Sequence, residues 1–239
     1  MSVYSLGLPE LERLGATGTV FVISDLVGKK YLDQPVMSAR MLQSLSSRGW
    51  EIGSHTRTHP NLTELSDSQI NAELLDSKER LEAITQTKVI SLSYPFNAQN
   101  NRIKAIAARY YKFVRVNRAC PPLRVNSVFP RDKMQINAVS SYDDPVALPL
   151  HLVKDLAKRM GYRPRGITKP RARKPLEARM VRKWLLSLRK DQWLVLTFHN
   201  IHTDKSPNPQ SIDLEAFREI VKVGDQLAEV VKFGGGVPT

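Results

Sequence analysis

The stretch Trp50-Glu51-Ile52-Gly53-Ser54-His55-Thr56-Arg57-Thr58-His59-Pro60 is the part of the sequence from which the fold can be predicted. It begins as a short apolar run, typical of a strand, and continues as a polar loop with two of the 5 histidines of the chain. Proteins of the α/β class bind ligands just outside the carboxyl ends of their strands. A strand followed by this loop therefore predicts an α/β fold with a functional site at the strand end.

The two histidines of this loop, His55 and His59, have the spacing of a metal-binding pair. Imidazole is the commonest protein ligand for zinc, and hydrolytic zinc sites have three protein ligands plus a water. Water bound to such a metal ionises near neutral pH and becomes a nucleophile. A His-x-x-x-His pair also arises by chance, and the two side chains are then surface or capping histidines. Both interpretations are open at this point.

Helix-like and strand-like stretches alternate on both sides of the loop. Residues 4–14 have apolar side chains at helical spacing, and residues 17–23 form a β-branched, apolar run typical of a buried strand. A Ser-x-x-Gln capping box opens a helix over residues 66–84, and residues 89–94 again read as a strand. Alternation with short connections predicts a parallel sheet or barrel flanked by helices.

Two further strand ends carry candidate functional residues. His199 follows the apolar run 193–198, where it could protonate a leaving group or stabilise an oxyanion; the alternative is a hydrogen-bonded core histidine. Tyr94, Pro95 and Phe96 end another strand, and a proline there makes a rigid turn. Such a turn could place an aromatic wall and backbone N–H groups beside a ligand, or it could be purely structural.

Composition excludes several classes of protein. The chain has 239 residues, enough for one large domain or two small ones, and its 41% hydrophobic content supports a substantial core. A single cysteine, Cys120, excludes a disulfide framework within one chain. No apolar stretch is long enough to span a bilayer, and the first residues do not resemble a signal peptide. As written, the chain is predicted to be cytoplasmic.

The positive charge is concentrated in residues 154–190. This segment holds 14 Lys and Arg residues against two acidic ones, so it accounts for nearly all of the net charge of +13. It could be a solvated loop and helix face, or a surface that docks on an acidic polymer or an anionic lipid surface. A nucleic-acid-binding module is the third interpretation, although the segment has only Tyr162 and Trp184 as aromatic residues.

Taken together, four stretches give the chain a family resemblance. Residues 8–22, 53–60, 93–97 and 194–199 stand in the order of motifs found in the polysaccharide deacetylase family, carbohydrate esterase family four. That family includes chitin-oligosaccharide and peptidoglycan deacetylases. The segment from His55 to His59 resembles its metal-binding motif. The order and spacing of the four stretches are more specific than any one of them.

The resemblance implies a fold and an activity. The expected fold is a deformed (β/α) barrel, formed as one domain over residues 1–239 with a basic insertion at about 154–190. The expected activity is metal-dependent removal of N-acetyl groups from a sugar polymer or oligomer. His55 and His59 would hold a divalent metal, most simply zinc, and His199 would be the general acid. The turn at Tyr94, Pro95 and Phe96 would contact the substrate, and its backbone would help to hold the oxyanion.

The sequence also departs from the family pattern. In the family, a Thr-Phe-Asp-Asp-Gly motif ends the first strand and supplies the general base and a third metal ligand. This motif would lie just before the helix that begins near Val3, where the chain has no counterpart. Neither Asp25 nor the pair Asp143-Asp144 maps onto a family motif. Many members also carry an Arg where Ser93 stands, and that Arg orients the base.

Three expectations follow from these departures. Met1 would be an internal start, so that the first strand, and with it a targeting segment, would lie upstream. The strand at residues 17–23 would then have an unpaired edge. The chain as written would be a weakened or inactive hydrolase. The rival from another class is a catalytically dead scaffold that still binds carbohydrate.

Overall fold

A computed structural model describes residues 2–31, 33–117, 126–127, 133, 136–140, 176–189, 192–203, 211–230 and 233. Its centre is a six-stranded sheet in the order β1-β4-β5-β6-β8-β10, and every neighbouring pair is parallel. The strands are β1 (Thr19–Val22), β4 (Glu51–Ser54), β5 (Ser91–Ser93), β6 (Phe113–Asn117), β8 (Ile136–Ser140) and β10 (Leu196–Thr197).

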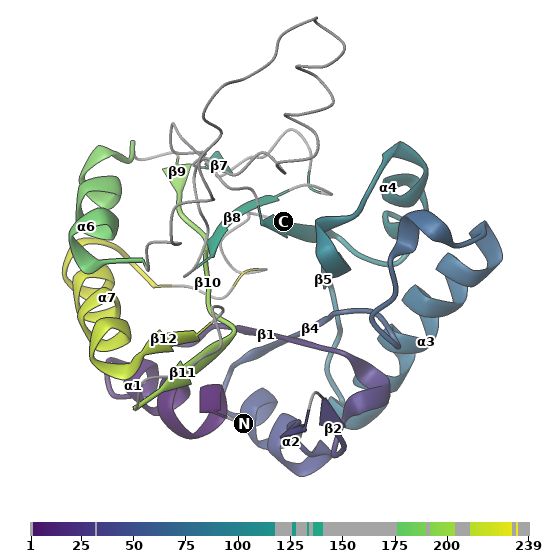
Figure 1. The fold of residues 1–239 in the computed structure, drawn as a ribbon, viewed down its shortest axis with the longest axis horizontal. Coiled ribbons are helices and arrows are strands. Elements are labelled where there is room, and N and C mark those ends of the chain that lie inside the picture. The colour runs from purple at the N-terminus through teal and green to yellow at the C-terminus, as the bar shows by residue number, and fades with distance from the viewer. Residues whose placement is uncertain are drawn as a thin grey trace, which may run out of the picture.

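The helices lie outside this sheet, which curves into a ring (Figure 1). They are η1 (Val3–Gly7), α1 (Leu8–Glu12), α2 (Ala39–Ser47), α3 (Asp67–Thr85), α4 (Asn101–Ala107), α6 (Ala178–Ser187) and α7 (Leu214–Leu227). Short 3-10 turns are η2 (Ser24–Leu26), η3 (Leu62–Glu64) and η4 (Pro95–Asn97). A curved parallel sheet with helices outside confirms the prediction of an α/β fold of the deformed-barrel type.

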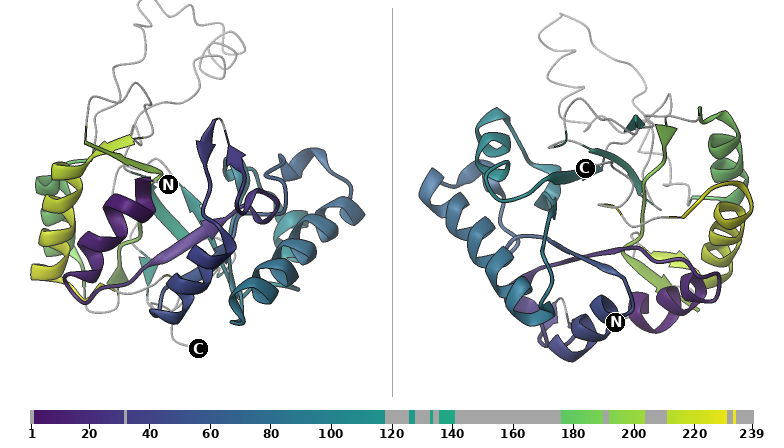
Figure 2. Two further views of the ribbon diagram at one scale, coloured as in Figure 1. Left: turned by 90° about the horizontal axis from the view of Figure 1, so that it is seen from below. Right: turned by 180° about the vertical axis from the view of Figure 1, so that it is seen from behind.

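Three two-stranded sheets complete the described part of the fold. β2 (Lys30–Tyr31) and β3 (Gln34–Pro35) form an antiparallel hairpin, which projects from the body in the left view of Figure 2. β7 (Asn126–Ser127) pairs with β9 (Gln192–Trp193), and β11 (Asn200–His202) pairs with β12 (Ser211–Asp213).

Local sequence signals explain where the longest helix begins. Ser66 caps α3, because its hydroxyl accepts from the backbone N–H of Gln69 while the Gln69 side chain accepts from the backbone N–H of Ser66. This is the predicted capping box, and it satisfies two donors that a helix start otherwise leaves without partners. α3 then runs for 19 residues and buries one apolar stripe, which includes Ile70, Leu74 and Leu81. The helix predicted from this signal is confirmed.

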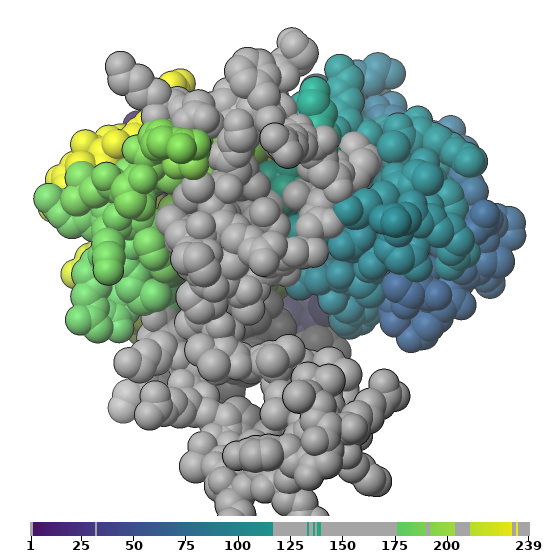
Figure 3. Space-filling view, turned by 90° about the horizontal axis from the view of Figure 1, so that it is seen from above, coloured from purple at the N-terminus to yellow at the C-terminus, as the bar shows by residue number. Residues whose placement is uncertain are grey.

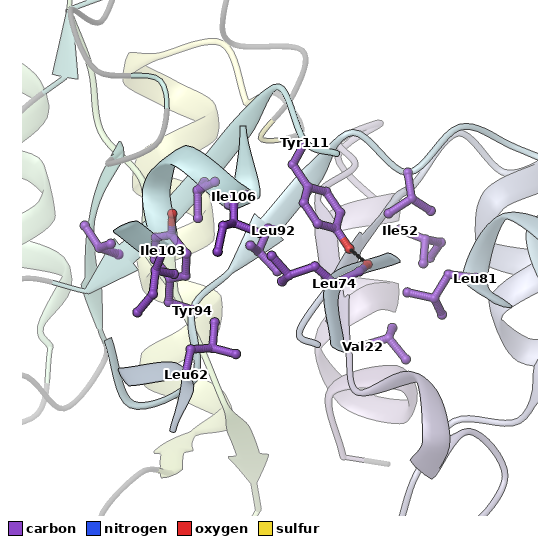
Figure 4. Close-up of a cluster of buried hydrophobic side chains, with 14 of the residues drawn as sticks. Val22, Ile52, Leu62, Leu74, Leu81, Leu92, Tyr94, Ile103, Ile106 and Tyr111 are labelled. Atoms are coloured by element: carbon purple, nitrogen blue, oxygen red, sulfur yellow. Dashed lines mark hydrogen bonds between the residues drawn. The ribbon is translucent and has the colours of Figure 1, made fainter. Parts of the chain in front are cut away.

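The larger apolar core lies between the first strands and α2, α3 and α4. Leu74 and Leu81 of α3 and Leu92 of β5 are all fully buried there, and Leu74 lies beside Leu92 (Figure 4). Tyr111 spans this core, and its buried hydroxyl donates to the Leu74 carbonyl at 2.8 Å. The core therefore ties α3 to the sheet directly behind the histidine loop.

A second cluster joins α6 and α7 to the other end of the ring. Val181 of α6 packs with Phe217 and Ile220 of α7 and with Ile201 of β11. In the space-filling view of Figure 3, α6 forms the surface on one side, and α3 and α4 form it on the other. The molecule thus has separate apolar supports for its early and its late strands.

The apolar run predicted as one strand over 193–198 is divided in the structure. Gln192 and Trp193 pair antiparallel with β7, whereas Leu196 and Thr197 join the main sheet beside β8. The run changes partner between the two pairs, so its hydrogen bonds cannot form one continuous ladder. In the part of the chain that the structure describes, β1 and β10 are the edges of the main sheet.

Part of the basic segment lies outside the described residues. Residues 154–175 and 190 belong to that part, and residues 176–189 include α6. Asp143 and Asp144 also lie outside it. Within the residues described, no helix combines the length and the apolar character needed to cross a membrane.

Candidate functional site

Three strand ends bring the predicted site residues together. His55 follows β4, Phe96 lies in the turn after β5, and His199 comes two residues after β10. Because these strands are parallel, their carboxyl ends meet at one edge of the sheet. Positive charge on His199 would lower the pKa of His55, and charge on His59 would lower the pKa of His199, so the three imidazoles lie within electrostatic reach of one another.

A backbone carbonyl sets the orientation of His55. Nδ1 of its ring lies 2.7 Å from the carbonyl oxygen of Ser93. A carbonyl oxygen can only accept, so Nδ1 carries the proton and Nε2 keeps its lone pair. Metal-bound histidines commonly show this arrangement, in which the second ring nitrogen donates to a carbonyl or a carboxylate. The tautomer of His55 therefore suits a metal ligand.

The loop places His59 against His55 at the cost of backbone strain. The two ring centroids are 4.7 Å apart, and the rings meet edge to face. Thr56 and His59 both have left-handed backbone conformations, with φ of 66° and 67°. Such conformations cost non-glycine residues about 1 kcal/mol or more each. The Thr56 hydroxyl accepts from the His59 backbone N–H at 3.0 Å and helps to hold the loop in this shape.

Glu73 of α3 holds the middle of the same loop. Its buried carboxylate accepts from the Thr58 backbone N–H at 2.9 Å and from the Thr58 hydroxyl at 2.7 Å. Its backbone carbonyl accepts from the Arg57 N–H at 3.1 Å. The same helix also reaches the start of the loop, because the Ser77 and Ser54 hydroxyls share a buried hydrogen bond of 2.8 Å. The core described above therefore positions the histidines through α3.

Arg115 of β6 is a buried cation beside the site. Its side chain is in register with Ser93, donates to the Ser93 hydroxyl, and stacks over Phe21 with 5.5 Å from the guanidinium carbon to the ring centroid. Only 5% of Arg115 is exposed. A positive charge in this position acts strongly on its neighbours, because little water screens it.

Burial and Arg115 together keep two imidazoles neutral. Burial lowers the pKa of His55 to about 3, and the Arg115 charge adds to this shift. The pKa of His199 falls to about 4 for the same two reasons in the same order. Burial also lowers the pKa of His59. Neutral imidazole is the form that binds metals, so the electrostatics of the site favour ligation at neutral pH.

The side chains of the turn after β5 point in different directions. Tyr94 is buried in the apolar core beside Leu62 and Ile103 (Figure 4), and Pro95 is also buried. Phe96 is 67% exposed, has a φ of 55°, and places its ring 4.7 Å from that of His59. Only Phe96 of the three thus presents its side chain to the histidines. The predicted oxyanion role of this backbone stays a prediction.

The site has two ligands suited to a metal on one loop. His55 and His59 fit such a role by tautomer and by proximity. Among the residues that the structure describes, however, no group of three or more His, Cys, Asp or Glu side chains could hold a metal ion. Asp25 does not complete the set, because its carboxylate lies 3.2 Å from Arg80 and 4.0 Å from Arg57. The described residues could therefore supply at most two of the four ligands of a typical zinc coordination shell at this loop.

Sequence reasoning missed Arg115 and Glu73. A charged residue in the apolar run of β6 was a usable signal for Arg115, because Arg is almost never fully buried unless it is paired. Glu73 gave no signal, since acidic residues are common on helices.

Comparison with known proteins agrees with this geometry. The polysaccharide deacetylase family profile matches residues 2–112, which include both loop histidines and the turn after β5. A curated relative is YxkH of Bacillus subtilis (strain 168), assigned by its name to the polysaccharide deacetylases. It is 27% identical over 97 residues, which make up 41% of this chain and 33% of the relative. The match thus spans about a third of the length of that relative.

Solved structures share the fold over nearly the whole chain. One is the Xyl-CE4 domain of a multidomain xylanase from the hindgut metagenome of Trinervitermes trinervoides, with a TM-score of 0.55 and 17% identity over 99% of this chain and 83% of that one. Another is BA3943 from Bacillus anthracis, a family four pseudoenzyme, with a TM-score of 0.54 and 15% identity over 97% of this chain and 59% of that one. Over residues 2–112 the chain is therefore similar in sequence to the polysaccharide deacetylase family, and its fold is similar to those of these solved structures.

Proposed function

We propose that this chain is built for metal-dependent removal of acetyl groups from an N-acetylated sugar polymer or oligomer. The observation that carries the proposal is the hydrogen bond from His55 Nδ1 to the Ser93 carbonyl, which leaves Nε2 with its lone pair next to the His59 ring. A divalent metal held there, most simply zinc, would supply a water that ionises near neutral pH.

The residues of the chain then have separate roles. His55 and His59 would hold the metal, and the Glu73 carboxylate keeps their loop in its strained shape through Thr58. His199 rests neutral because its pKa is lowered, so it has to accept a proton before it delivers one to the leaving amine. The backbone N–H groups of Tyr94 and Phe96 would donate to the developing oxyanion, whereas Pro95 has no N–H to offer.

The test is acetate release from an N-acetylglucosamine oligomer with added Zn²⁺ or Co²⁺. It is run on this chain and on a version extended upstream by a strand that ends in Asp-Asp. His199→Gln in the active version should lower kcat by about 100-fold or more, because it removes the group that moves the proton. An extended protein that binds zinc and releases no acetate contradicts the proposed reaction.

A second candidate function is carbohydrate binding without catalysis. It is favoured by the fact that only two metal-ligating side chains meet among the described residues. A catalytically dead scaffold would bind the oligomer with the same affinity with and without zinc. It would also release no acetate in either version of the chain.

The basic segment at 154–190 keeps its open interpretations. One experiment tests both docking on an acidic polymer or anionic surface and binding of nucleic acid. It measures how strongly the chain is retained on a column of the acidic polymer or of DNA as the salt concentration rises. If either interpretation is correct, neutralising Arg171, Arg173 and Lys174 should make retention depend less steeply on the salt concentration. Unchanged retention leaves the solvated-face interpretation.

A further inference from the structure

Two exposed aromatic rings stand next to the histidine pair. The described part of the chain exposes five large apolar side chains: Leu14, Tyr31, Leu75, Phe96 and Leu186. The two aromatic ones among them, Tyr31 and Phe96, both contact the imidazole of the same histidine, His59. Exposed aromatic side chains gathered at one point, rather than scattered, are the mark of a binding surface.

Different elements supply the two rings. Tyr31 comes from the hairpin β2–β3, and its ring centroid is 6.1 Å from that of His59 at an interplanar angle of 63°. Phe96 comes from the turn after β5, with a centroid distance of 4.7 Å and an angle of 64°. Both meetings are edge to face. In this edge-to-face geometry, neither aromatic ring lies flat on the imidazole.

The backbone gives both rings defined positions. Tyr31 pairs with Gln34 across the hairpin, and the base of the hairpin is closed by hydrogen bonds from Val36 N–H to Lys29 O and from Gly28 N–H to Met37 O, both 2.9 Å. Phe96 stands at a positive φ of 55°, which few residues of its size adopt. Strain of this kind at an exposed aromatic residue points to a role for the ring outside the core.

We propose that the Tyr31 and Phe96 rings form a sugar-stacking platform that holds a pyranose ring of the substrate beside His59. The C–H groups on one face of a pyranose ring pack against an aromatic face, while its hydroxyl groups stay in water. A platform in contact with a metal-ligating histidine would hold the acetamido group close to the metal. This inference rests on the proposed function and adds the hairpin to the substrate-binding residues.

The platform also accounts for the tyrosine at the hairpin. Tyr31 is 41% exposed to water and meets His59 only edge to face, so part of its ring stays open to a ligand. A ring that stacks needs its face and not its hydroxyl. The platform therefore requires an aromatic side chain at position 31 and tolerates phenylalanine.

The experiment measures oligosaccharide binding apart from catalysis. Binding of an N-acetylglucosamine tetramer to the metal-free chain is followed by saturation-transfer NMR and calorimetry. Tyr31→Ala should weaken binding by about fivefold or more, whereas Tyr31→Phe should stay within about twofold of the unchanged chain. Leu14→Ala is the matched control, because Leu14 is also 41% exposed and stands outside the aromatic group.

The outcomes separate this inference from the proposed function. Binding that depends on the Tyr31 ring, with no acetate released by any version, supports the platform and counts against the reaction. Acetate release with the same KM in the unchanged chain and in Tyr31→Ala overturns the platform and leaves the reaction standing. Equal loss of binding in Tyr31→Ala and Leu14→Ala, or no binding by the unchanged chain, also overturns it.

Discussion

Replacing Glu73 with alanine should loosen the loop that carries both histidines. The Glu73 carboxylate accepts two hydrogen bonds from Thr58, at 2.9 and 2.7 Å, and its side chain is 8% exposed. A hydrogen bond to a charged group contributes about 1.5 kcal/mol or more, so losing both should cost about 3 kcal/mol of unfolding free energy. The contact between Glu73 and Arg57 at 3.7 Å adds little, because Arg57 is 40% exposed.

The same change should weaken metal binding. Without the Glu73 carboxylate, Thr58 loses the two hydrogen bonds that fix the loop between the left-handed residues Thr56 and His59, and the histidine pair becomes less ordered. Loss of an outer-shell partner of this kind lowers metal affinity by about 10- to 100-fold. Urea unfolding followed by circular dichroism gives the stability, and competition with a chromogenic chelator gives the zinc affinity.

Two variants sharpen this test. In Glu73→Gln, the amide oxygen can still accept from the Thr58 N–H, and the amide NH2 can donate to the Thr58 hydroxyl. The free energy of unfolding should therefore fall by only about 1 kcal/mol. Glu79→Ala on the exposed face of α3 is the control and should stay within about 0.5 kcal/mol of the unchanged chain. If Glu73→Ala unfolds at the same urea concentration as Glu79→Ala, or binds zinc as tightly, the reasoning about the loop is refuted.

Three further predictions concern the site and its support. His55 and His199 have folded-state pKa values of about 3 and about 4 against an ordinary 6.5, so the unfolded chain binds more protons between these values and stability falls with falling pH. Each of the two histidines should lower the free energy of unfolding by about 2 kcal/mol between pH 7 and pH 5, as measured by urea unfolding. His55→Asn should make this fall of stability with pH less steep. Arg115→Met should raise the pKa of both histidines in an NMR titration, and unchanged values would contradict the electrostatic role of the guanidinium. Gly53→Ala should lower the free energy of unfolding by about 1 to 3 kcal/mol, because its new methyl group would stand 2.7 Å from an aromatic ring of β1. Gly224→Ala in α7 is the control, because the nearest atom to its new methyl group would be 3.7 Å away on Val230; it should stabilise the chain by about 0.5 to 1 kcal/mol, and a loss there would count against the packing argument.

Local signals predicted much of the fold because they act within one element. The Ser66 and Gln69 side chains begin α3 by contacts three residues apart, so the sequence alone reveals them. The apolar run predicted as a strand over residues 17–23 likewise contains β1, Thr19–Val22. The histidines were found because both stand in one loop, directly after the strand that the apolar run predicted.

Contacts between different helices and strands could not be predicted from the sequence. Arg115 meets the Ser93 hydroxyl through the register of β6 against β5, and no pattern along the chain specifies that register. Tyr94 looked like a ligand-facing residue, but its side chain is buried in the core, and Phe96, two positions on, is the residue of this turn whose ring meets His59. The division of the run 193–198 also depended on its partners, β7 and β8.

The two apolar supports described above divide the site along the length of the chain. The histidine loop depends on the core shared by α2, α3 and α4, all of which come from the first half of the sequence, whereas His199 comes after α6 and shortly before α7. Domains are synthesised from the amino end, so the residues that would bind the metal leave the ribosome well before the proposed acid. During synthesis, therefore, a nascent chain would acquire its metal-binding loop first and the group that moves the proton last.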